Sequence, residues 1–387
     1  PTPVSDAPQE RPVVVGAGCA GLFAALTLAK AGLKPLLIER GDPAFRRSHA
    51  IDLFLKERIL DPESNIQFGL GGAGTFSDGK LNTGTKNPAH RLILETFVEA
   101  GAPRDILWDA KPHIGSDILP TVVTAISQRI EQLGGIVRYR TKLVDIHIDA
   151  SGAITGIDVQ SSQDAAYEPI ETKHLILACG HSARDIFELL KDHNVALAQK
   201  TFAMGVRIEH PQRDIDRAQY GALAGHPALG AAPYKLVAHL PNGRSVFSFC
   251  MCPGGFIVPA MTDAAQSVVN GMSPSGRTSP YANSGMVTEV RPADFEHLRA
   301  EWGELAGLKF QQQFEELARQ HGGEHQVAPA QRVADFVAGR PSAALPKTSY
   351  IPGIIPSRLD EWMPPFIGEG LRRGIATFGR RMRGFVT

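Results

Sequence analysis

The chain has 387 residues, 43% of them hydrophobic, and its 40 basic residues balance 40 acidic ones. This length exceeds what one hydrophobic core usually organises, so we expect two domains. Balanced charge excludes a strong attraction to nucleic acid or anionic membranes, and the sequence shows neither a long apolar run nor a secretory leader. We therefore expect a cytoplasmic protein that acts on a small-molecule substrate, without a nucleic-acid partner or membrane span. The sequence makes no prediction of oligomeric state.

The 4 cysteines are too few and too unevenly spaced for a disulfide framework. No C-x-x-C or His-rich spacing suggests zinc, so we expect reduced thiols and no metal site. Residues 1–11 are expected to form a disordered tail ahead of the first strand.

The strongest motif follows a buried strand expected at residues 13–15. Gly16, Gly18 and Gly21 form a G-x-G-x-x-G pattern, followed by an apolar helix and a second strand that ends at Glu39. In such a motif the glycines serve the tight turn, the approach of a pyrophosphate and helix–strand packing, in that order. The helix N-terminus suits phosphates, and the Glu39 carboxylate can accept hydrogen bonds from an adenosine ribose. The pattern predicts a dinucleotide site; the alternative is glycine-rich helix–strand packing alone.

A long insertion, residues 41–134, follows the second strand, whereas an NAD-type Rossmann domain would pass quickly to a third parallel strand. Its glycine-rich loop carries Gly72 and Gly74, which permit a left-handed backbone and an anion-binding nest. Ser77 and Lys80 could add a hydroxyl and a charge. The alternative for this loop is an ordinary solvent-exposed connection.

The insertion is expected to contain helices at 89–100 and 117–133. An antiparallel meander of strands should follow it, and then a buried strand that enters a turn at Gly180. Ser182 and Asp185 should cap the helix after that turn. This order of elements is typical of FAD domains rather than nicotinamide domains. The meander strands are expected at 136–140, 143–149 and 153–159.

The character of the sequence changes near residue 200, where strands and loops become dominant. We expect an FAD-binding domain at 12–199, a β-rich α+β substrate domain at 200–330, and a C-terminal segment at 331–387 that returns toward the FAD domain. The fold class is α/β, with a Rossmann-like three-layer FAD-binding domain built from a parallel sheet and a meander. No second glycine fingerprint follows residue 200, so any NAD(P)H would bind only transiently.

Three residues are candidates for catalysis. His181 follows a strand-end glycine and titrates near neutral pH, although it could instead bond a loop carbonyl. Arg207 and Glu209 share one face of a strand, so Arg207 could hold an anionic substrate that Glu209 orients. A structural ion pair between them is the alternative.

Cys250 and Cys252 also share a strand face. A C-x-C pair of this kind could relay electrons from a flavin to a disulfide. Two small buried hydrophobic residues would explain the pair without the strain that such a disulfide requires.

Several stretches together resemble one family, the uncharacterised FAD-dependent or NAD(FAD)-utilising dehydrogenases within the glutathione-reductase-like flavoproteins. They include VVVGAGCAGLFAA, NIQFGLGGAGTFSDGKL, ACGHSARD, GVRIEHPQ and FSFCMCPGG, and the likeness covers nearly the whole chain. The resemblance implies FAD as cofactor and a flavin redox role with an unsettled substrate. Members usually carry a further N-terminal domain and a C-terminal segment that completes the flavin cradle, so we expect part of the flavin-ring contacts to come from such a segment.

The resemblance also implies roles for particular residues. It places Glu39 and Arg40 at the adenosine ribose, the loop around Gly72 against the flavin, and Leu143 and Val144 beside the adenine. Cys179 and Gly180 belong to the second flavin motif, where Cys179 replaces a threonine of the family. The prediction is an FAD-dependent oxidoreductase of unknown substrate, reduced by that substrate or by transient NAD(P)H. The alternatives are a flavin-dependent RNA-modifying enzyme and a non-catalytic FAD-binding protein.

Overall fold

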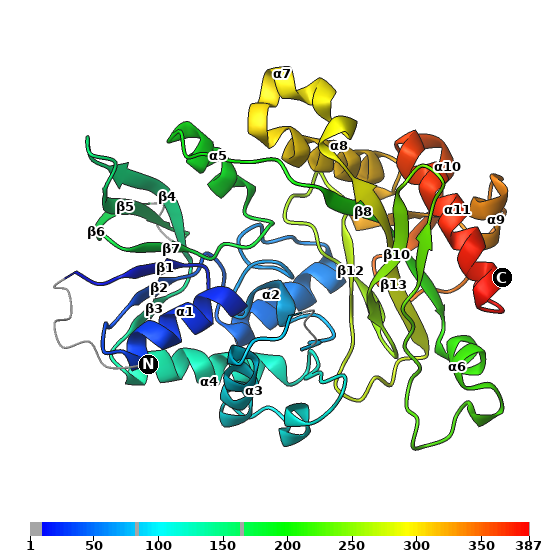
Figure 1. Cartoon of the computed structure of the whole chain (residues 1–387), viewed down its shortest axis with the longest axis horizontal. Coiled ribbons are helices and arrows are strands. Elements are labelled where there is room, and N and C mark those ends of the chain that lie inside the picture. Colours follow the sequence, from blue (N-terminus) through cyan, green and yellow to red (C-terminus); the bar gives the residue numbers. More distant parts are fainter. Residues whose placement is uncertain (1–9, 82–84, 163–165, 387) are drawn as a thin grey trace. The chain divides into compact units, whose positions relative to one another are not determined.

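The chain divides into two compact units, residues 1–197 and residues 198–387, called here the first and the second unit. The disordered tail expected at the N-terminus lies almost wholly outside the described residues. The computed structural model describes residues 10–81, 85–162 and 166–386 (Figure 1).

A four-stranded parallel sheet forms the centre of the first unit. Its strands are β1 Val13–Val15, β2 Leu36–Ile38, β3 Ile136–Arg138 and β7 Leu175–Leu177. They lie in the order β3-β2-β1-β7, so the glycine turn follows an inner strand. Parallel sheets need cover on both faces, because both faces carry apolar side chains.

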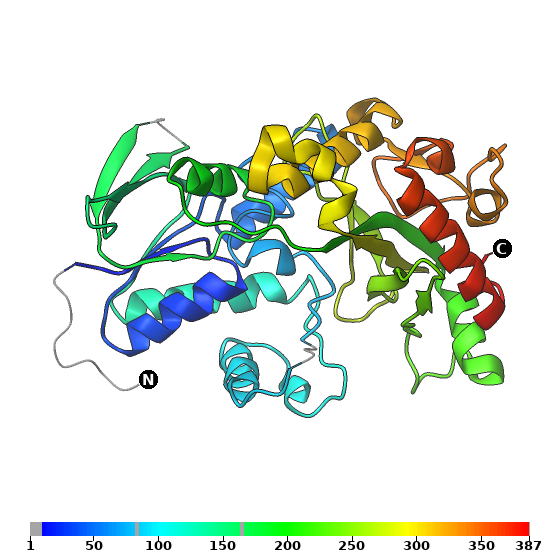
Figure 2. The same ribbon diagram turned by 45° about the horizontal axis from the view of Figure 1, so that its top comes forward.

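The two faces of this sheet receive alternate residues of each strand. Val14 and Leu37 point into a core shared with two helices that lie side by side, α1 and α4 (Figures 1 and 2). Val13, Val15 and Ile38 point into a second core on the other face, shared with the meander and α5. The first unit therefore has the expected three layers. Its helices are α1 Cys19–Lys30, α2 Ala44–Glu57, α3 Ala89–Glu99, α4 Leu119–Gln132 and α5 Arg184–Asp192.

The meander differs from the expectation at its first strand. Its strands are β4 Thr141–Ile148, β5 Ile154–Ser161 and β6 Tyr167–Glu171. The stretch expected to open the meander, 136–140, instead contains β3, which pairs in parallel with β2. Arg140, with φ of 52°, turns the chain between β3 and β4. The meander is completed by β6, which the sequence analysis did not include.

The expected cap of α5 is also wrong. The helix has Ala183 at its N-cap, and no side chain caps it. Ser182 Oγ lies 3.3 Å from Gln67 Oε1 instead, and Asp185 pairs with Arg40. Both side chains that the local pattern assigned to the cap therefore interact with residues that are distant in the sequence.

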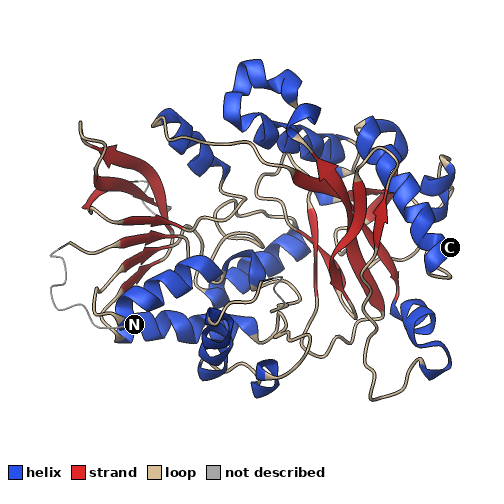
Figure 3. Cartoon of the chain, in the orientation of Figure 1, coloured by secondary structure: helices blue, strands red, loops and turns tan. Residues whose placement is uncertain are grey.

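An antiparallel sheet in the order β8-β13-β10-β9 forms the centre of the second unit (Figure 3). Two smaller strand pairs, β11 with β12 and β14 with β15, accompany it. The strands are β8 Phe202–Pro211, β9 Val237–His239, β10 Ser245–Cys252, β11 Phe256–Pro259, β12 Val269–Met272, β13 Tyr281–Val290, β14 Ala328–Ala330 and β15 Ile354–Pro356.

The C-terminal helix packs on this same sheet. Leu371, Ile375 and Phe378 of α11 are buried in a core with β-strand residues such as Val246 and Met286. The apolar face of α11 is thus covered by its own unit. The helices of the second unit are α6 Gln212–Tyr220, α7 Arg299–Trp302, α8 Ala306–Gln320, α9 Val333–Ala338, α10 Leu359–Trp362 and α11 Pro365–Arg381.

Within the described ranges, no helix of either unit is long and apolar enough to cross a membrane.

A fully buried arginine organises the loop that follows α2. The Arg47 guanidinium donates to the carbonyl oxygens of Asn65, Ile66 and Leu70 at 2.8–2.9 Å, and to that of Gly69 at 3.4 Å. Burial lowers the pKa of Arg47 to about 9, and the negative charge of Glu39 opposes this shift. The group remains charged at neutral pH, where its hydrogen bonds to four carbonyls replace lost hydration.

Replacing this arginine should loosen the first unit selectively. Arg47→Met leaves the buried carbonyl oxygens of Asn65 and Ile66 without a donor, and each orphaned group costs about 1–3 kcal/mol, so we expect a loss of about 2–6 kcal/mol. Hydrogen-exchange mass spectrometry should show lost protection in residues 12–75 and unchanged protection in β8 and β13. Arg46→Met, at the exposed neighbouring position, is the control. Equal protection in the two variants would contradict this role.

Candidate cofactor site

A cavity of about 510 Å³ lies within the first unit, where β1 and β7 end. Gly16 and Gly18, after β1, and Ala178, Cys179 and Gly180, after β7, line it. In a parallel sheet this edge, at the carboxyl ends of neighbouring strands, is where nucleotides commonly bind. The first turn of α1 also lines the cavity, and no side chain caps that helix. Its N-terminus is therefore available to an anion.

The fingerprint glycines meet different steric demands. A Cβ atom on Gly21 would lie 1.8 Å from the Gly16 carbonyl oxygen, so this position permits close packing of α1 on the turn. Gly16 has φ of 98°, and a Cβ there would lie 2.5 Å from the Ala178 oxygen. At Gly18 the nearest atom, Gly72 Cα, would be 3.8 Å away. The absence of a side chain at Gly18 therefore keeps space open in the cavity, and packing alone does not require it.

Glu39 is buried, and its carboxylate accepts hydrogen bonds from three backbone N–H groups. Its Oε2 accepts from the Ala17 N–H at 2.7 Å, and its Oε1 accepts from Gly41 and Gly69 at 2.9 Å each. These bonds join the glycine turn, the end of β2 and the loop after α2. A carboxylate offers about four acceptor positions, so one remains for a ribose hydroxyl.

Arg40 lies in an ion-pair network at the same side of the cavity. Its guanidinium pairs with Asp185 and Glu63 and stacks over the Phe68 ring at 4.5 Å. Lys142 Nζ lies 3.1 Å from Asp185 Oδ2 and also lines the cavity. Burial raises the pKa of Asp185, but the charges and hydrogen bonds of Arg40 and Lys142 outweigh it and leave that pKa lowered.

Only part of the glycine-rich loop faces the cavity. Gly71, Gly72 and Gly74 line it, and Gly72 has φ of 63°. Ser77 and Lys80 do not line it. Ser77 Oγ donates to the Gly74 carbonyl at 2.7 Å, and Lys80 Nζ pairs with buried Asp78 at 3.2 Å. The structure thus gives both side chains roles within the loop.

The meander and the second flavin motif contribute further lining residues. Leu143 is buried and lines the cavity, whereas its neighbour Val144 does not and sits at an irregularity between β4 and β5. Cys179 and Gly180 line the cavity at the end of β7. Burial, the largest influence, raises the pKa of Cys179 to about 11, so this thiol stays protonated at neutral pH.

His181 also lines this cavity. Its side chain is solvent-exposed on one side, and desolvation followed by the charge of Arg184 lowers its pKa. The imidazole forms no hydrogen bond with any described residue, so the alternative of a carbonyl-bonded histidine finds no support. A neutral imidazole at pH 7 can accept a proton.

The other two catalytic candidates lie in the second unit, on β8. Arg207 Nε donates to Asn283 Oδ1 and Nη2 to the Cys250 carbonyl, both at 2.8 Å. Glu209 accepts from the Ser349 hydroxyl and from the Ser349 N–H at 3.1 Å. Arg207 and Glu209 therefore form no ion pair with each other, so the alternative of a structural ion pair between them is wrong. Glu209 anchors a loop, which leaves Arg207 as the candidate for ligand binding.

Cys250 and Cys252 are both free thiols. A register shift between Phe249 and Cys252 marks a β-bulge, and Cys250 has φ of 45°. The bulge turns the Cys250 carbonyl toward Arg207, while buried Cys252 places Sγ 3.6 Å from Arg207 Nη2. The two residues thus position an arginine in this structure.

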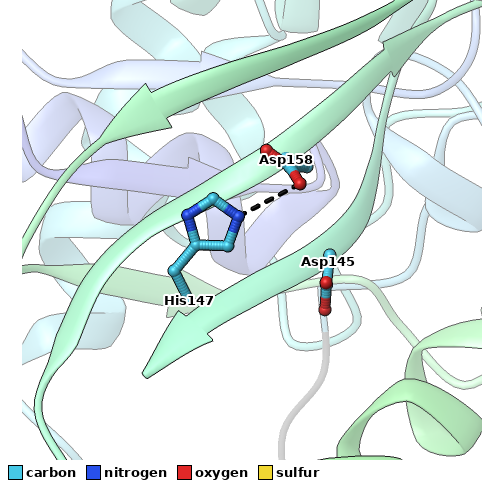
Figure 4. A group of neighbouring side chains, drawn as sticks. All are labelled: Asp145, His147 and Asp158. Carbon is cyan, nitrogen blue, oxygen red and sulfur yellow. Dashed lines mark ion pairs between the residues drawn. The ribbon is translucent and has the colours of Figure 1, made fainter. Parts of the chain in front are cut away.

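One group of side chains on the meander has the composition of a metal site. Asp145, His147 and Asp158 present oxygen and nitrogen atoms within 4.8 Å of one another (Figure 4). His147 already pairs with Asp158 at 3.0 Å, and His193 pairs with Asp145 at 2.6 Å. Two histidine–aspartate pairs account for the arrangement, so it does not by itself indicate a metal.

The residues present fit a dinucleotide such as FAD. An uncapped helix terminus and open space at Gly18 suit the pyrophosphate, Glu39 retains an acceptor position, and Leu143 offers an apolar surface. The structure adds Gln67 and Phe68 to the lining, which the sequence analysis missed. Both precede the glycine-rich loop in a segment without periodicity, so no local signal marked them.

Comparisons with known proteins agree with this geometry. Residues 10–214 match the pyridine nucleotide-disulphide oxidoreductase family. Residues 201–387 match a second family, described as "FAD-dependent protein, C-terminal domain-like". These matches define the class, FAD-dependent oxidoreductases. A Clostridium beijerinckii protein described as uncharacterized is 42% identical over 381 residues, which is 98% of this chain and 69% of that protein. The chain belongs to the pyridine nucleotide-disulphide oxidoreductase family.

Solved flavoproteins show weaker similarity. Glycerol-3-phosphate dehydrogenase from Bacillus halodurans, complexed with FAD, has a TM-score of 0.37 and 12% identity and covers 76% of this chain. A flavoprotein/dehydrogenase from Cytophaga hutchinsonii has a TM-score of 0.35 and 14% identity and covers 77%. The chain spans 52% and 62% of the lengths of these two proteins.

The arrangement at Glu39 predicts a combined loss of affinity and stability. Glu39→Ala removes the acceptor of three buried N–H groups as well as the position open to ribose. A charged hydrogen bond is worth about 1.5–3 kcal/mol, so FAD affinity should fall roughly tenfold to a hundredfold by calorimetry. Glu95→Ala, which removes a partly exposed carboxylate of α3 outside the lining, should change FAD affinity little. Unchanged affinity in folded Glu39→Ala would remove Glu39 from the ribose site.

The lowered pKa of His181 predicts its behaviour in a titration. Its ring proton signals in NMR should titrate below the ordinary histidine value of about 6.5, because the native state resists protonation. Stability should correspondingly decline as the pH falls through that range. Added FAD should shift these signals and leave those of His239, in the second unit, unaffected. A normal titration that FAD does not alter would place His181 outside the site.

Proposed function

We propose that the chain binds FAD in the cavity of the first unit and oxidises or reduces a small organic substrate. The observation that carries this proposal is the cavity itself, at the ends of β1 and β7, with an uncapped helix and open glycines along its wall. The family membership supports the same assignment. FAD, when bound, supplies the two-electron redox chemistry.

The residues that line the cavity would bind and orient the cofactor and accept a proton. Gly18 and the first turn of α1 hold the pyrophosphate, and Glu39 with Arg40 orients the adenosine half. Leu143 lies against the adenine. His181, neutral at pH 7, accepts a proton from the substrate as electrons leave it. Oxidation without proton transfer would create unfavourable charge in a partly desolvated cavity.

NAD(P)H is the proposed transient electron donor. The family name of the matched region supports a pyridine nucleotide, and no second glycine fingerprint follows residue 200 to hold one permanently. Neutral overall charge gives no support to an RNA-modifying role, the first alternative. The second alternative, a non-catalytic FAD-binding protein, predicts a bound flavin that no donor reduces.

Two spectroscopic measurements test this function. The absorbance spectrum after incubation with FAD and removal of the excess should show bound flavin in roughly equimolar amount. Anaerobic titration with NADH and then NADPH should bleach that absorbance with at least one of them. Gly18→Ala, which places a methyl group in the cavity with its nearest atom 3.8 Å away, should fold and yet retain little flavin. Retention of FAD by that variant, or bound flavin that neither nucleotide reduces, would contradict the corresponding part of the proposal.

A further inference from the structure

The second unit holds an arginine that has no acidic partner. Arg207 is half-buried on β8, and none of the described residues forms a salt bridge with it. Its Nε and Nη2 atoms are held by Asn283 Oδ1 and the Cys250 carbonyl, at 2.8 Å each. Among the described residues Nη1 donates to no acceptor. The side chain is therefore fixed in direction while its charge stays uncompensated.

The surrounding backbone is shaped to accommodate this guanidinium. Gly285 lies directly opposite Arg207 on β13, and a Cβ on Gly271 of β12 would fall 2.2 Å from both Arg207 Nη2 and Asn283 Oδ1. The bulge in β10 holds Cys250 at φ of 45°, in the left-handed region that non-glycine residues rarely adopt. Bulges and strained residues of this kind concentrate at functional sites, where they redirect a group. Here the redirected group is the carbonyl that holds Arg207.

An exposed aromatic residue, Phe249, lies on the same face of the sheet as Arg207. Phe249 pairs with Gly285 from the other side, so Arg207 and Phe249 share one face of the sheet. The point that a Gly285 Cβ would occupy is 3.6 Å from Phe249 Cβ and 3.8 Å from Arg207 Nη1. Phe249 is 62% exposed, although the opposite face of this sheet is packed in a core. A cation and an exposed aromatic residue thus lie on one face of the sheet, on either side of Gly285.

The hydrogen-bonding groups on this face include more unused donors than unused acceptors. Asn283 is fully buried, its Oδ1 accepts from Arg207, and its Nδ2 has no partner among the described residues. Arg207 Nη1 adds further unused donors. Glu209, the acid nearest along the strand, is already engaged by Ser349. An acceptor with negative charge would satisfy this face, and its body would have to be apolar to cover Phe249.

We propose that this face, over Gly285, binds the carboxylate group of a small organic acid, with Arg207 on the carboxylate and Phe249 on its apolar body. This inference rests on the proposed function, since the acid becomes a substrate only if the bound FAD reacts with it. Arg207 is then a substrate-binding residue. Cys250, Asn283 and Gly271 are positioning residues that fix the direction of its guanidinium.

Matched probes test the proposal on the FAD-loaded chain. Calorimetry should show that benzoate binds at least about tenfold tighter than benzamide, which has the same ring without the charge, because about 1.4 kcal/mol corresponds to that ratio. Sulfate, which has charge without an apolar body, should bind more weakly than benzoate. Arg207→Gln should abolish the preference for benzoate over benzamide, whereas Arg207→Lys should keep part of it. Phe249→Ala should weaken both aromatic probes to a similar extent.

Arg213→Gln is the control, because Arg213 is an exposed arginine of the same unit. Equal binding of benzoate and benzamide by the unaltered chain, no binding of either, or sulfate as tight as benzoate would overturn the carboxylate site even if Arg207→Gln failed to fold. The absorbance of bound FAD is recorded in each sample. Bound, reducible flavin without benzoate binding would reject only this inference, whereas benzoate binding without reducible flavin would reject only the proposed function.

Discussion

Two opposite buried charges hold the first unit together through its backbone. The Glu39 carboxylate accepts from the N–H groups of Ala17, Gly41 and Gly69, and the Arg47 guanidinium donates to carbonyl oxygens within residues 65–70. The two side chains make no direct ion pair, yet each lies within the electrostatic influence of the other. Loops seldom bury so many polar backbone groups, because each needs a partner. This charge pair supplies those partners, and the walls of the cavity depend on it.

The same arrangement would allow the Glu39 carboxylate to stabilise the loops and also to bind the ribose, as proposed above. A ribose acceptor must be held in one orientation before the ligand arrives, since ordering it during binding would consume affinity. Three backbone donors fix the Glu39 carboxylate in that way. In the second unit, Asn283 and the Cys250 carbonyl fix Arg207 by comparable means.

The sequence predicted those parts of the fold whose signal is local. The β1–α1–β2 sequence carries a β-branched run, a glycine pattern and an apolar helix, and its three-layer setting was expected from the order of elements. By contrast β13, an inner strand of the second sheet, was not predicted, because YANSGMVTEV alternates no clear apolar and polar faces. Its small residues are buried because neighbouring strands and Arg207 pack tightly around them. The partners of Glu209 and Ser182 likewise depend on tertiary contacts that no spacing rule contains.

The position of β1 between β2 and β7 has a consequence for synthesis on the ribosome. Val13 pairs with Leu36 soon after both emerge, but its other partner is Leu175, which follows the whole insertion and the meander. Until then the nascent chain presents one apolar strand edge without a neighbour, a feature that promotes association between chains. Chaperone binding during this interval would prevent association between chains through the unpaired edge of β1. The long insertion thus delays formation of the part of the cavity that the end of β7 supplies.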